Sequence, residues 1–175
     1  SPDDINLIKG SPENKRKYFD SYMAKIYSEY TETLLKFRKA LTNRTVIIKK
    51  IKDGNTSEKK HLDIWNEIFS EEASKIISYR NSFVNSLNEY FFYSYKNISG
   101  ASFSPKIKYI NSLSVQEKKD ILKNLENNYR KEILLGITLQ GPQRDNYLFI
   151  DDNEEDCTPY FSQGQKRAVA LALKC

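Results

Sequence analysis

The sequence has few of the residues on which metal sites and nucleophilic triads depend. Its 175 residues include one histidine, His61, and two cysteines, Cys157 and Cys175. Zinc hydrolases need several nitrogen or sulfur ligands and a Ser-His-Asp triad needs a positioned histidine, so the composition argues against both classes. Two cysteines also make neither a disulfide framework nor a metal cluster, and the expected location is the reducing cytoplasm.

Two longer patterns are missing as well. No apolar run approaches the length of a membrane span and no signal-peptide pattern opens the chain, so we expect no membrane partner. No Gly-x-x-x-x-Gly-Lys-Ser/Thr loop is present to hold nucleotide phosphates. Tyr147–Asp152 resembles the acidic strand that accompanies such loops, with four apolar residues before two acids. The acids continue to Asp156, however, which favours a solvated turn.

Positive charge is concentrated in one window. The chain carries a net charge of +5, and between Lys36 and Lys60 nine basic residues stand against two acidic ones, a local net charge of +7. Two interpretations stay open: a solvated helix face, or a stripe that contacts nucleic-acid phosphates. The candidate DNA-binding residues are Lys36, Arg38, Lys39, Arg44, Lys49, Lys50 and Lys52.

Apolar periodicity predicts a mainly α protein with a small β part, in the α+β class. A helix opens at Ser11-Pro12, and a second ends in a turn at residues 53–55. Residues 55–99 contain neither Gly nor Pro and form one long helix or two. We expect this segment to act as a lever packed antiparallel to the preceding helices. Ser114 and Glu117 have the spacing of a capping box for a further helix, which Gly136 would end.

The β part is expected in three short segments. Alternation around Ile107 predicts an edge strand, and Ile137–Leu139 with Tyr147–Ile150 predicts a hairpin around Gly141-Pro142. A final helix begins at Ser162. The predicted division is a helical domain over residues 1–112, followed by a domain over residues 113–175 that carries the hairpin and the last helix.

The tetrapeptide Ser162-Gln163-Gly164-Gln165 has two interpretations. Ser162 and Gln165 have the spacing of a capping box, which is a structural role. That role leaves Gly164 unexplained, since glycine costs about 1 kcal/mol relative to alanine within a helix. A glycine at a helix start lets backbone N–H groups approach a phosphate, and the helix dipole favours an anion there. The four residues are therefore also a candidate phosphate site.

Three stretches resemble, in order, motifs of the RecF family of DNA repair proteins. Tyr160–Lys174 (YFSQGQKRAVALALK) resembles the family signature, Ser-Gln-Gly-Gln-Gln-Arg followed by an Ala/Leu-rich helix. Ser1–Asp20 (SPDDINLIKGSPENKRKYFD) resembles a segment with Ser-Pro-Glu-Asp-Leu, Gly-Ser-Pro and Arg-Arg. Gly136–Phe149 (GITLQGPQRDNYLF) resembles Gly-Thr-Thr-Leu followed by Gly-Pro-His-Arg-Asp-Asp.

The chain departs from these motifs at a few positions. Gln143 replaces the histidine, Asn146 the second aspartate and Lys166 a glutamine, and residues 15–17 reproduce the arginine pair only in part. A proton-transfer role for that histidine is therefore not expected here. The signature itself is intact.

The resemblance implies a relative of ABC and SMC ATPases. It implies that the first domain is a lever and arm and that the second is part of an ATPase head. The phosphate-binding loop would lie upstream and Walker B downstream, so the chain would be the middle of a longer protein. The signature residues Ser162, Gln163, Gly164 and Gln165 would complete, in trans, the ATP and Mg²⁺ site of another subunit in an ATP-dependent homodimer. The chain alone would bind no nucleotide and hydrolyse none.

The resemblance also suggests further sites and partners. Asp3 and Asp4 occupy a Q-loop-like position, where they would sense Mg²⁺ or the attacking water, or would be surface acids. Arg144 and Asp145 belong to a family motif of unknown role. The implied partners are DNA, with single-strand/duplex junctions, and proteins of the RecO and RecR type. The alternative function is a non-enzymatic helical module that binds DNA or recruits such partners.

Overall fold

The computed structural model describes residue 8, residues 10–100 and residues 103–174. Asp3 and Asp4 lie outside the described residues, so their Q-loop-like role stays a prediction. The chain forms two compact units that alternate along the sequence. The strand unit comprises Ser1–Met23, Arg80–Ile110 and Asp145–Cys175, and the helical unit comprises Ala24–Tyr79 and Asn111–Arg144. The predicted boundary after residue 112 falls inside the helical unit, and the division into arm and head stays a prediction about function.

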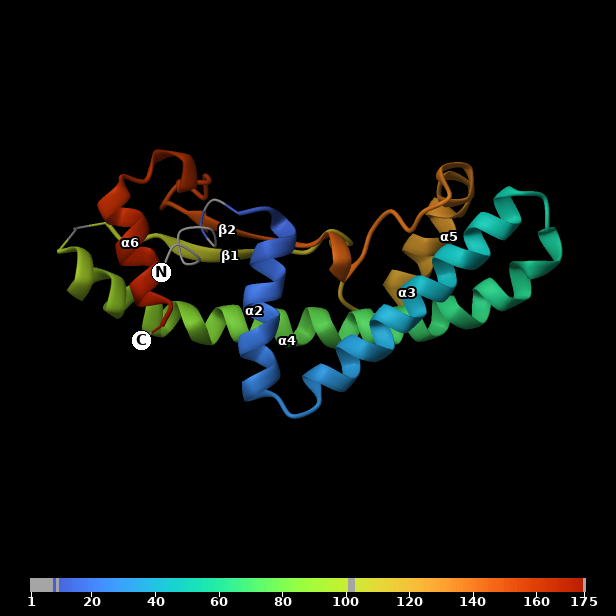
Figure 1. Cartoon of the computed structure of the whole chain (residues 1–175), viewed down its shortest axis with the longest axis horizontal. Coiled ribbons are helices and arrows are strands. Elements are labelled where there is room, and N and C mark those ends of the chain that lie inside the picture. The colour runs from blue at the N-terminus through green and yellow to red at the C-terminus, as the bar shows by residue number, and fades with distance from the viewer. Residues whose placement is uncertain (1–7, 9, 101–102, 175) are drawn as a thin grey trace. The chain divides into compact units, whose positions relative to one another are not determined.

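The elements follow the mainly helical prediction (Figure 1). The helices are α2 (Pro12–Ile26), α3 (Tyr30–Lys52), α4 (Lys59–Ser99), α5 (Lys118–Leu135) and α6 (Gln163–Ala172), and the strands are β1 (Lys106–Ile110) and β2 (Asn146–Ile150). Short 3-10 turns cover Thr56–Glu58, Pro142–Arg144 and Thr158–Tyr160. No described helix combines the length and the apolar character that crossing a membrane requires.

Helix α4 is one uninterrupted helix of 41 residues, which decides between the two predicted alternatives of one long helix or two. At 1.5 Å per residue it is about 60 Å long. In the helical unit its first half packs antiparallel to α3: Phe37 contacts Phe69, and Arg44 further along α3 contacts the earlier Asn66. Asp53 and Gly54 end α3 as predicted.

The core of the helical unit contains a buried arginine. Arg44 is 1% exposed, and its guanidinium donates to Asn66 Oδ1 at 2.7 Å, Thr138 Oγ1 at 2.7 Å and Glu132 Oε2 at 2.9 Å, while stacking 4.9 Å from the Phe69 ring centre. Burial lowers the pKa of Arg44, and the Glu132 carboxylate opposes that shift. Because its side chain is inside the core, Arg44 does not belong to the candidate DNA-binding surface, and that prediction is wrong for this residue.

The predicted hairpin does not form. Strand β2 pairs antiparallel with β1, with Ile107 opposite Phe149, and helix α5 lies between the two strands in sequence. Ile137–Leu139 is not a strand, because side chains satisfy the backbone of this region. The Leu139 N–H donates to Glu132 Oε1 and the Gly141 N–H to Ser112 Oγ, each at 2.9 Å.

The capping box predicted at Ser114 is also absent. Helix α5 begins at Lys118, and Glu117 precedes it without a side-chain cap. Asn111 organises the preceding turn instead: its Oδ1 accepts from the Leu113 N–H and its Nδ2 donates to the Val115 carbonyl. Ser114 has a left-handed backbone, with φ of 57°. A residue that caps the start of a helix needs an extended backbone, so Ser114 cannot be the N-cap of α5. Gly136 ends α5 as predicted.

Gly141 has tighter surroundings than Gly54, Gly100, Gly136 and Gly164. With φ of +136°, a Cβ there would lie 2.6 Å from Phe69 Cζ and 2.6 Å from Gln143 Oε1. Gly54 also has a positive φ, +102°, but a Cβ there would meet nothing within 4 Å. The two glycines share backbone strain and differ in packing, so they form a matched pair.

We expect Gly141→Ala to lower the free energy of unfolding by about 1–3 kcal/mol more than Gly54→Ala does, because only Gly141→Ala adds a clash with a buried ring. Both substitutions carry the backbone penalty of a non-glycine residue at positive φ. Urea denaturation of the 175-residue protein measures both variants against the original. Equal destabilisation by the two substitutions would contradict the packing role of Gly141.

Candidate functional site

Helix α6 begins with the predicted capping box. Ser162 has an extended backbone, its Oγ accepts from the Gln165 N–H at 3.2 Å, and its own N–H donates to Gln165 Oε1 at 2.8 Å. The first N–H groups of a helix have no partner within the helix. Since the box engages Ser162 and Gln165, the N–H groups of Gln163 and Gly164 remain for solvent or a ligand. Ser162, Gln163 and Gly164 are exposed.

Packing does not require glycine at position 164. A Cβ there would have Ser162 Oγ as its nearest neighbour, at 3.8 Å, an ordinary van der Waals contact. Its φ is also outside the left-handed region. The absent side chain leaves the backbone N–H open to close approach, which fits an anion or a partner surface.

The charged residues near the start of α6 favour an anion and do not stabilise the helix itself. The first turn has no acidic residue, and Arg167 follows it with an exposed side chain. Cations are unfavourable near a helix N-terminus, where the dipole is positive. Ser162, Gly164 and Arg167 line an open concavity together with Ile98 and Ser99 from the end of α4.

The segment that leads into α6 is held by contacts with strand β2. The Cys157 N–H donates to the Phe149 carbonyl at 2.9 Å, and the Phe161 ring lies 6.3 Å from that of Phe149, centre to centre. Burial raises the pKa of Cys157 to about 11, so this thiol stays protonated and inert at neutral pH. The residue before Ser162 is thus fixed to β2.

The acidic segment after β2 forms a turn, as predicted. Asp151 Oδ1 accepts from the N–H groups of Asn153 and Glu155, and residues 152–155 are exposed. Across the described ranges, no cluster of three or more His, Cys, Asp or Glu side chains could hold a metal ion.

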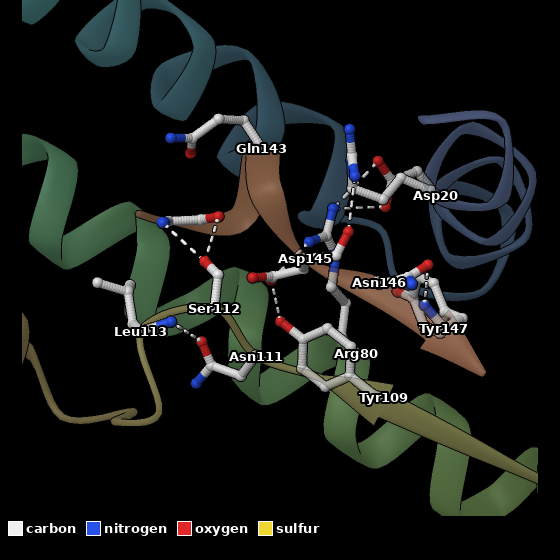
Figure 2. A network of polar contacts seen from close by, with 12 residues as sticks. Asp20, Arg80, Tyr109, Asn111, Ser112, Leu113, Gln143, Asp145, Asn146 and Tyr147 are labelled. Atoms are coloured by element: carbon white, nitrogen blue, oxygen red, sulfur yellow. Dashed lines mark hydrogen bonds and ion pairs between the residues drawn. The ribbon is translucent and has the colours of Figure 1, made fainter. Parts of the chain in front are cut away.

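The Arg144-Asp145 motif divides between surface and interior. Arg144 is exposed, whereas Asp145 is 0% exposed. Asp145 Oδ2 accepts from Arg80 Nη1 at 2.9 Å and from the Tyr109 hydroxyl, as Figure 2 shows. Its backbone carbonyl accepts from Arg16 Nη1 at 2.6 Å.

Arg80 joins two carboxylates inside the strand unit. Its Nη2 donates to both oxygens of Asp20, at 3.0 and 3.3 Å, while Nη1 binds Asp145 (Figure 2). Helices α2 and α4 and strand β1 therefore all meet the residue that precedes β2. Burial raises the pKa of Tyr109 well above its usual range and lowers that of Arg16. Tyr109 thus remains a hydrogen-bond donor to Asp145.

Sequence reasoning singled out Asp145 but missed its partners Arg80 and Tyr109, and it also missed Asp20, the second carboxylate that Arg80 binds. One signal was available for Arg80. It lies within the apolar stripe of its helix, four residues after Ile76 and three before Phe83, where a charged residue must be buried with a partner. Lys15 and Arg16 also have structural contacts, since Lys15 Nζ donates to the Tyr147 carbonyl at 3.0 Å.

The remaining basic residues of the Lys36–Lys60 window are exposed, but several are engaged. Lys36 pairs with Glu32 at 2.7 Å and Lys50 with Glu58 at 3.2 Å. A Cβ at Gly136 would lie 3.4 Å from Lys52 Cδ and 3.8 Å from Lys49 Cγ, so both lysines lie at the C-terminus of α5, where the helix dipole favours cations. The exposed candidates are Lys36, Arg38, Lys39, Lys49, Lys50 and Lys52.

Comparison with known proteins places this geometry in a family. No protein-family model matches the sequence. The "DNA replication and repair protein RecF" of Halothermothrix orenii is 35% identical over 182 residues, and the match covers 99% of this chain and 48% of the relative. The protein of that name from Bacillus velezensis is 32% identical over 182 residues, with 99% and 49% covered.

Solved structures give the same result. The fold matches a structure of "the recombination mediator protein RecF-ATP in RecFOR pathway" with a TM-score of 0.89 at 32% identity, and one of RecF-ATPrS with 0.86 at 35% identity. Each match covers 99% of this chain and 48% of the other. The described architecture is thus that of about half of a DNA repair protein of the RecF type. The chain belongs to the RecF family, and it spans about half the length of the relatives it matches.

Asp145→Ala is expected to lower the free energy of unfolding by about 3–5 kcal/mol, because Arg80 Nη1 and the Tyr109 hydroxyl would both lose their buried acceptor. Tyr109→Phe removes one hydroxyl and keeps the ion pair, so its cost should be about 1 kcal/mol. Asp152→Ala, at an exposed acid beyond β2, is the matched control. Urea denaturation gives all three values. The network would lose its structural importance if Asp145→Ala unfolded at the same urea concentration as the control.

Proposed function

We propose that this chain supplies the signature motif that completes an ATP site in trans at an ATP-dependent dimer of a RecF-family repair protein. The observation that carries the proposal is the exposed start of α6, which is capped by its own side chains and leaves two N–H groups open. An open helix N-terminus with a nearby arginine fits a phosphate group.

Each signature residue has a proposed role. The Ser162 hydroxyl and the Gly164 N–H would donate to a terminal phosphate held by the partner subunit. Gln165 would orient the motif through its bonds to Ser162, and Arg167 adds positive charge beside it. Bound ATP with Mg²⁺ would supply the negative charge that links the two subunits, and its hydrolysis would separate them.

The described residues do not fit a complete nucleotide site. They contain no acidic cluster for Mg²⁺, and the sequence has no phosphate-binding loop. Hydrolysis is therefore proposed for the whole protein, and no catalytic residue is assigned in this chain.

The partners are proposed from the family. RecF structures solved with ATP are described as part of the RecFOR pathway. DNA, including single-strand/duplex junctions, a second copy of the protein, and RecO- and RecR-type proteins are the proposed partners in the cytoplasm.

Ser162→Asp separates the cap from the phosphate contact. Aspartate caps a helix as well as serine does, so a full-length RecF protein that carries this segment should melt at an unchanged temperature. A carboxylate would repel the incoming phosphate, so ATP-dependent dimerisation should be abolished. Light scattering with and without ATP, beside a thermal melt, measures both properties.

Asn153→Asp is the control, since it adds the same charge at an exposed turn of the strand unit. It should leave dimerisation intact. A Ser162→Asp variant that is stable and still dimerises with ATP would refute the trans contact.

A second candidate function is DNA binding by the exposed part of the basic window. Six of its seven candidate residues are on the surface of α3, and two of them, Arg38 and Lys39, are consecutive. Exposed cations at this density attract phosphates over long range.

Replacing Lys49, Lys50 and Lys52 together by alanine should weaken duplex DNA binding and flatten its dependence on salt. Each phosphate that the variant no longer neutralises reduces the slope of log K against log salt by about 0.9. Fluorescence anisotropy at several salt concentrations measures the slope in the full-length protein. An unchanged slope and affinity would show that the basic window is a solvated helix face that does not contact DNA.

A further inference from the structure

Exposed aromatic rings gather at the end of α4. In the described chain, four large aromatic side chains are exposed: Tyr90 at 72%, Tyr93 at 69% and Tyr160 at 84%, and Phe92 less so at 37%. Three of the four lie within residues 90–93. Single exposed apolar residues are ordinary on a protein surface, but a cluster of rings marks a contact site.

These rings have a defined geometry. Phe92 and Tyr93 are 5.4 Å apart, centre to centre, with their planes at 87°, so the two rings meet edge to face. Lys96 Nζ lies 4.3 Å from the centre of the Phe92 ring. Phe92 is therefore packed by its neighbours, and Tyr93 is the ring available to a partner. Tyr90 lies three residues before it, on the same face of the helix.

Phe92 and Tyr93 border a groove between α4 and the beginning of β1. Asn88, Glu89, Phe92, Tyr93, Pro105 and Lys106 line it. Asn88 holds the two sides together, because its side chain accepts from the Ile107 N–H and donates to the Ile107 carbonyl, both at 2.8 Å. The groove is thus built into the strand unit before any partner arrives, which lowers the entropy cost of binding.

The charge around the groove is positive. Lys96 and Lys106 stand against the single acid Glu89, while the nearby Lys108 is paired with Glu154 at 2.6 Å. Exposed rings flanked by lysines are suited to a polymeric ligand in which flat apolar groups alternate with negative charges. Single-stranded nucleic acid has this chemistry, since its unpaired bases stack on aromatic rings and its phosphates contact cations.

We propose that this groove binds single-stranded nucleic acid, with a base stacked on Tyr93 and the adjoining phosphates contacting Lys96 and Lys106. The surface is distinct from the start of α6 and from the basic window. The choice of nucleic acid as the partner class rests on the proposed function. Binding in this groove needs neither ATP nor a second subunit.

The experiment compares two fluorescent strands on the 175-residue protein. One is oligo-dT and the other is an abasic strand with the same number of phosphates. Anisotropy without nucleotide should show tighter binding of oligo-dT. Tyr93→Ala should weaken that binding on the order of tenfold and leave the abasic strand unaffected. Tyr93→Phe keeps the ring and should bind as the original does.

Tyr160→Ala is the matched control, because it removes another exposed tyrosine, one that lies near the acidic turn. It should change neither affinity. Lys106→Ala should reduce the salt slope for oligo-dT by about 0.7, the value for one phosphate on a single strand. Circular dichroism verifies that each variant is folded.

Two outcomes would overturn the proposal. One is equal affinity for the two strands, and the other is equal behaviour of Tyr93→Ala and Tyr160→Ala. If, in addition, Tyr93→Ala alters sedimentation of the protein alone, the groove is a contact between copies of the chain. Duplex binding that depends on Lys49, Lys50 and Lys52 reports on the basic window, so the two proposals fail separately.

Discussion

Arg80 satisfies two buried carboxylates at once, and the strand unit is organised around that fact. A lone arginine or a lone aspartate could not be buried here without a large desolvation penalty. Arg80 binds Asp20 on α2 and Asp145, the residue before β2, and Tyr109 on β1 donates a further hydrogen bond to Asp145. The ion pairs therefore fix which elements meet, and β2 in turn carries the segment that ends in the exposed start of α6.

Local patterns predicted the elements well where the reasons were local. Helix α4 has no Gly or Pro to interrupt it, Gly54 and Gly136 end their helices, and Ser162 caps α6. The hairpin prediction was wrong because distant side chains decided the outcome. Glu132 and Ser112 satisfy the backbone around Leu139 and Gly141, and no residue close in sequence indicates that arrangement.

Charge alone did not predict whether a basic residue lies on the surface or in the core. Arg44 looked like one more surface cation, although it stands seven residues from both Phe37 and Ile51 and thus on the buried face of α3. The signature tetrapeptide was readable because its cap is made within four residues. The groove beside Tyr93 was not, because it forms between segments that only the fold brings together.

The cap on α6 has a chemical consequence. The Ser162 oxygen accepts from Gln165, and its own hydrogen remains free to point outward. One hydroxyl can thus receive a bond from the helix and give another to an anion without releasing the first. An anion that bound here as proposed would therefore require no change in the conformation of the motif. Docking at this position would be a rigid-body event, with a rate limited by encounter and alignment instead of by local refolding.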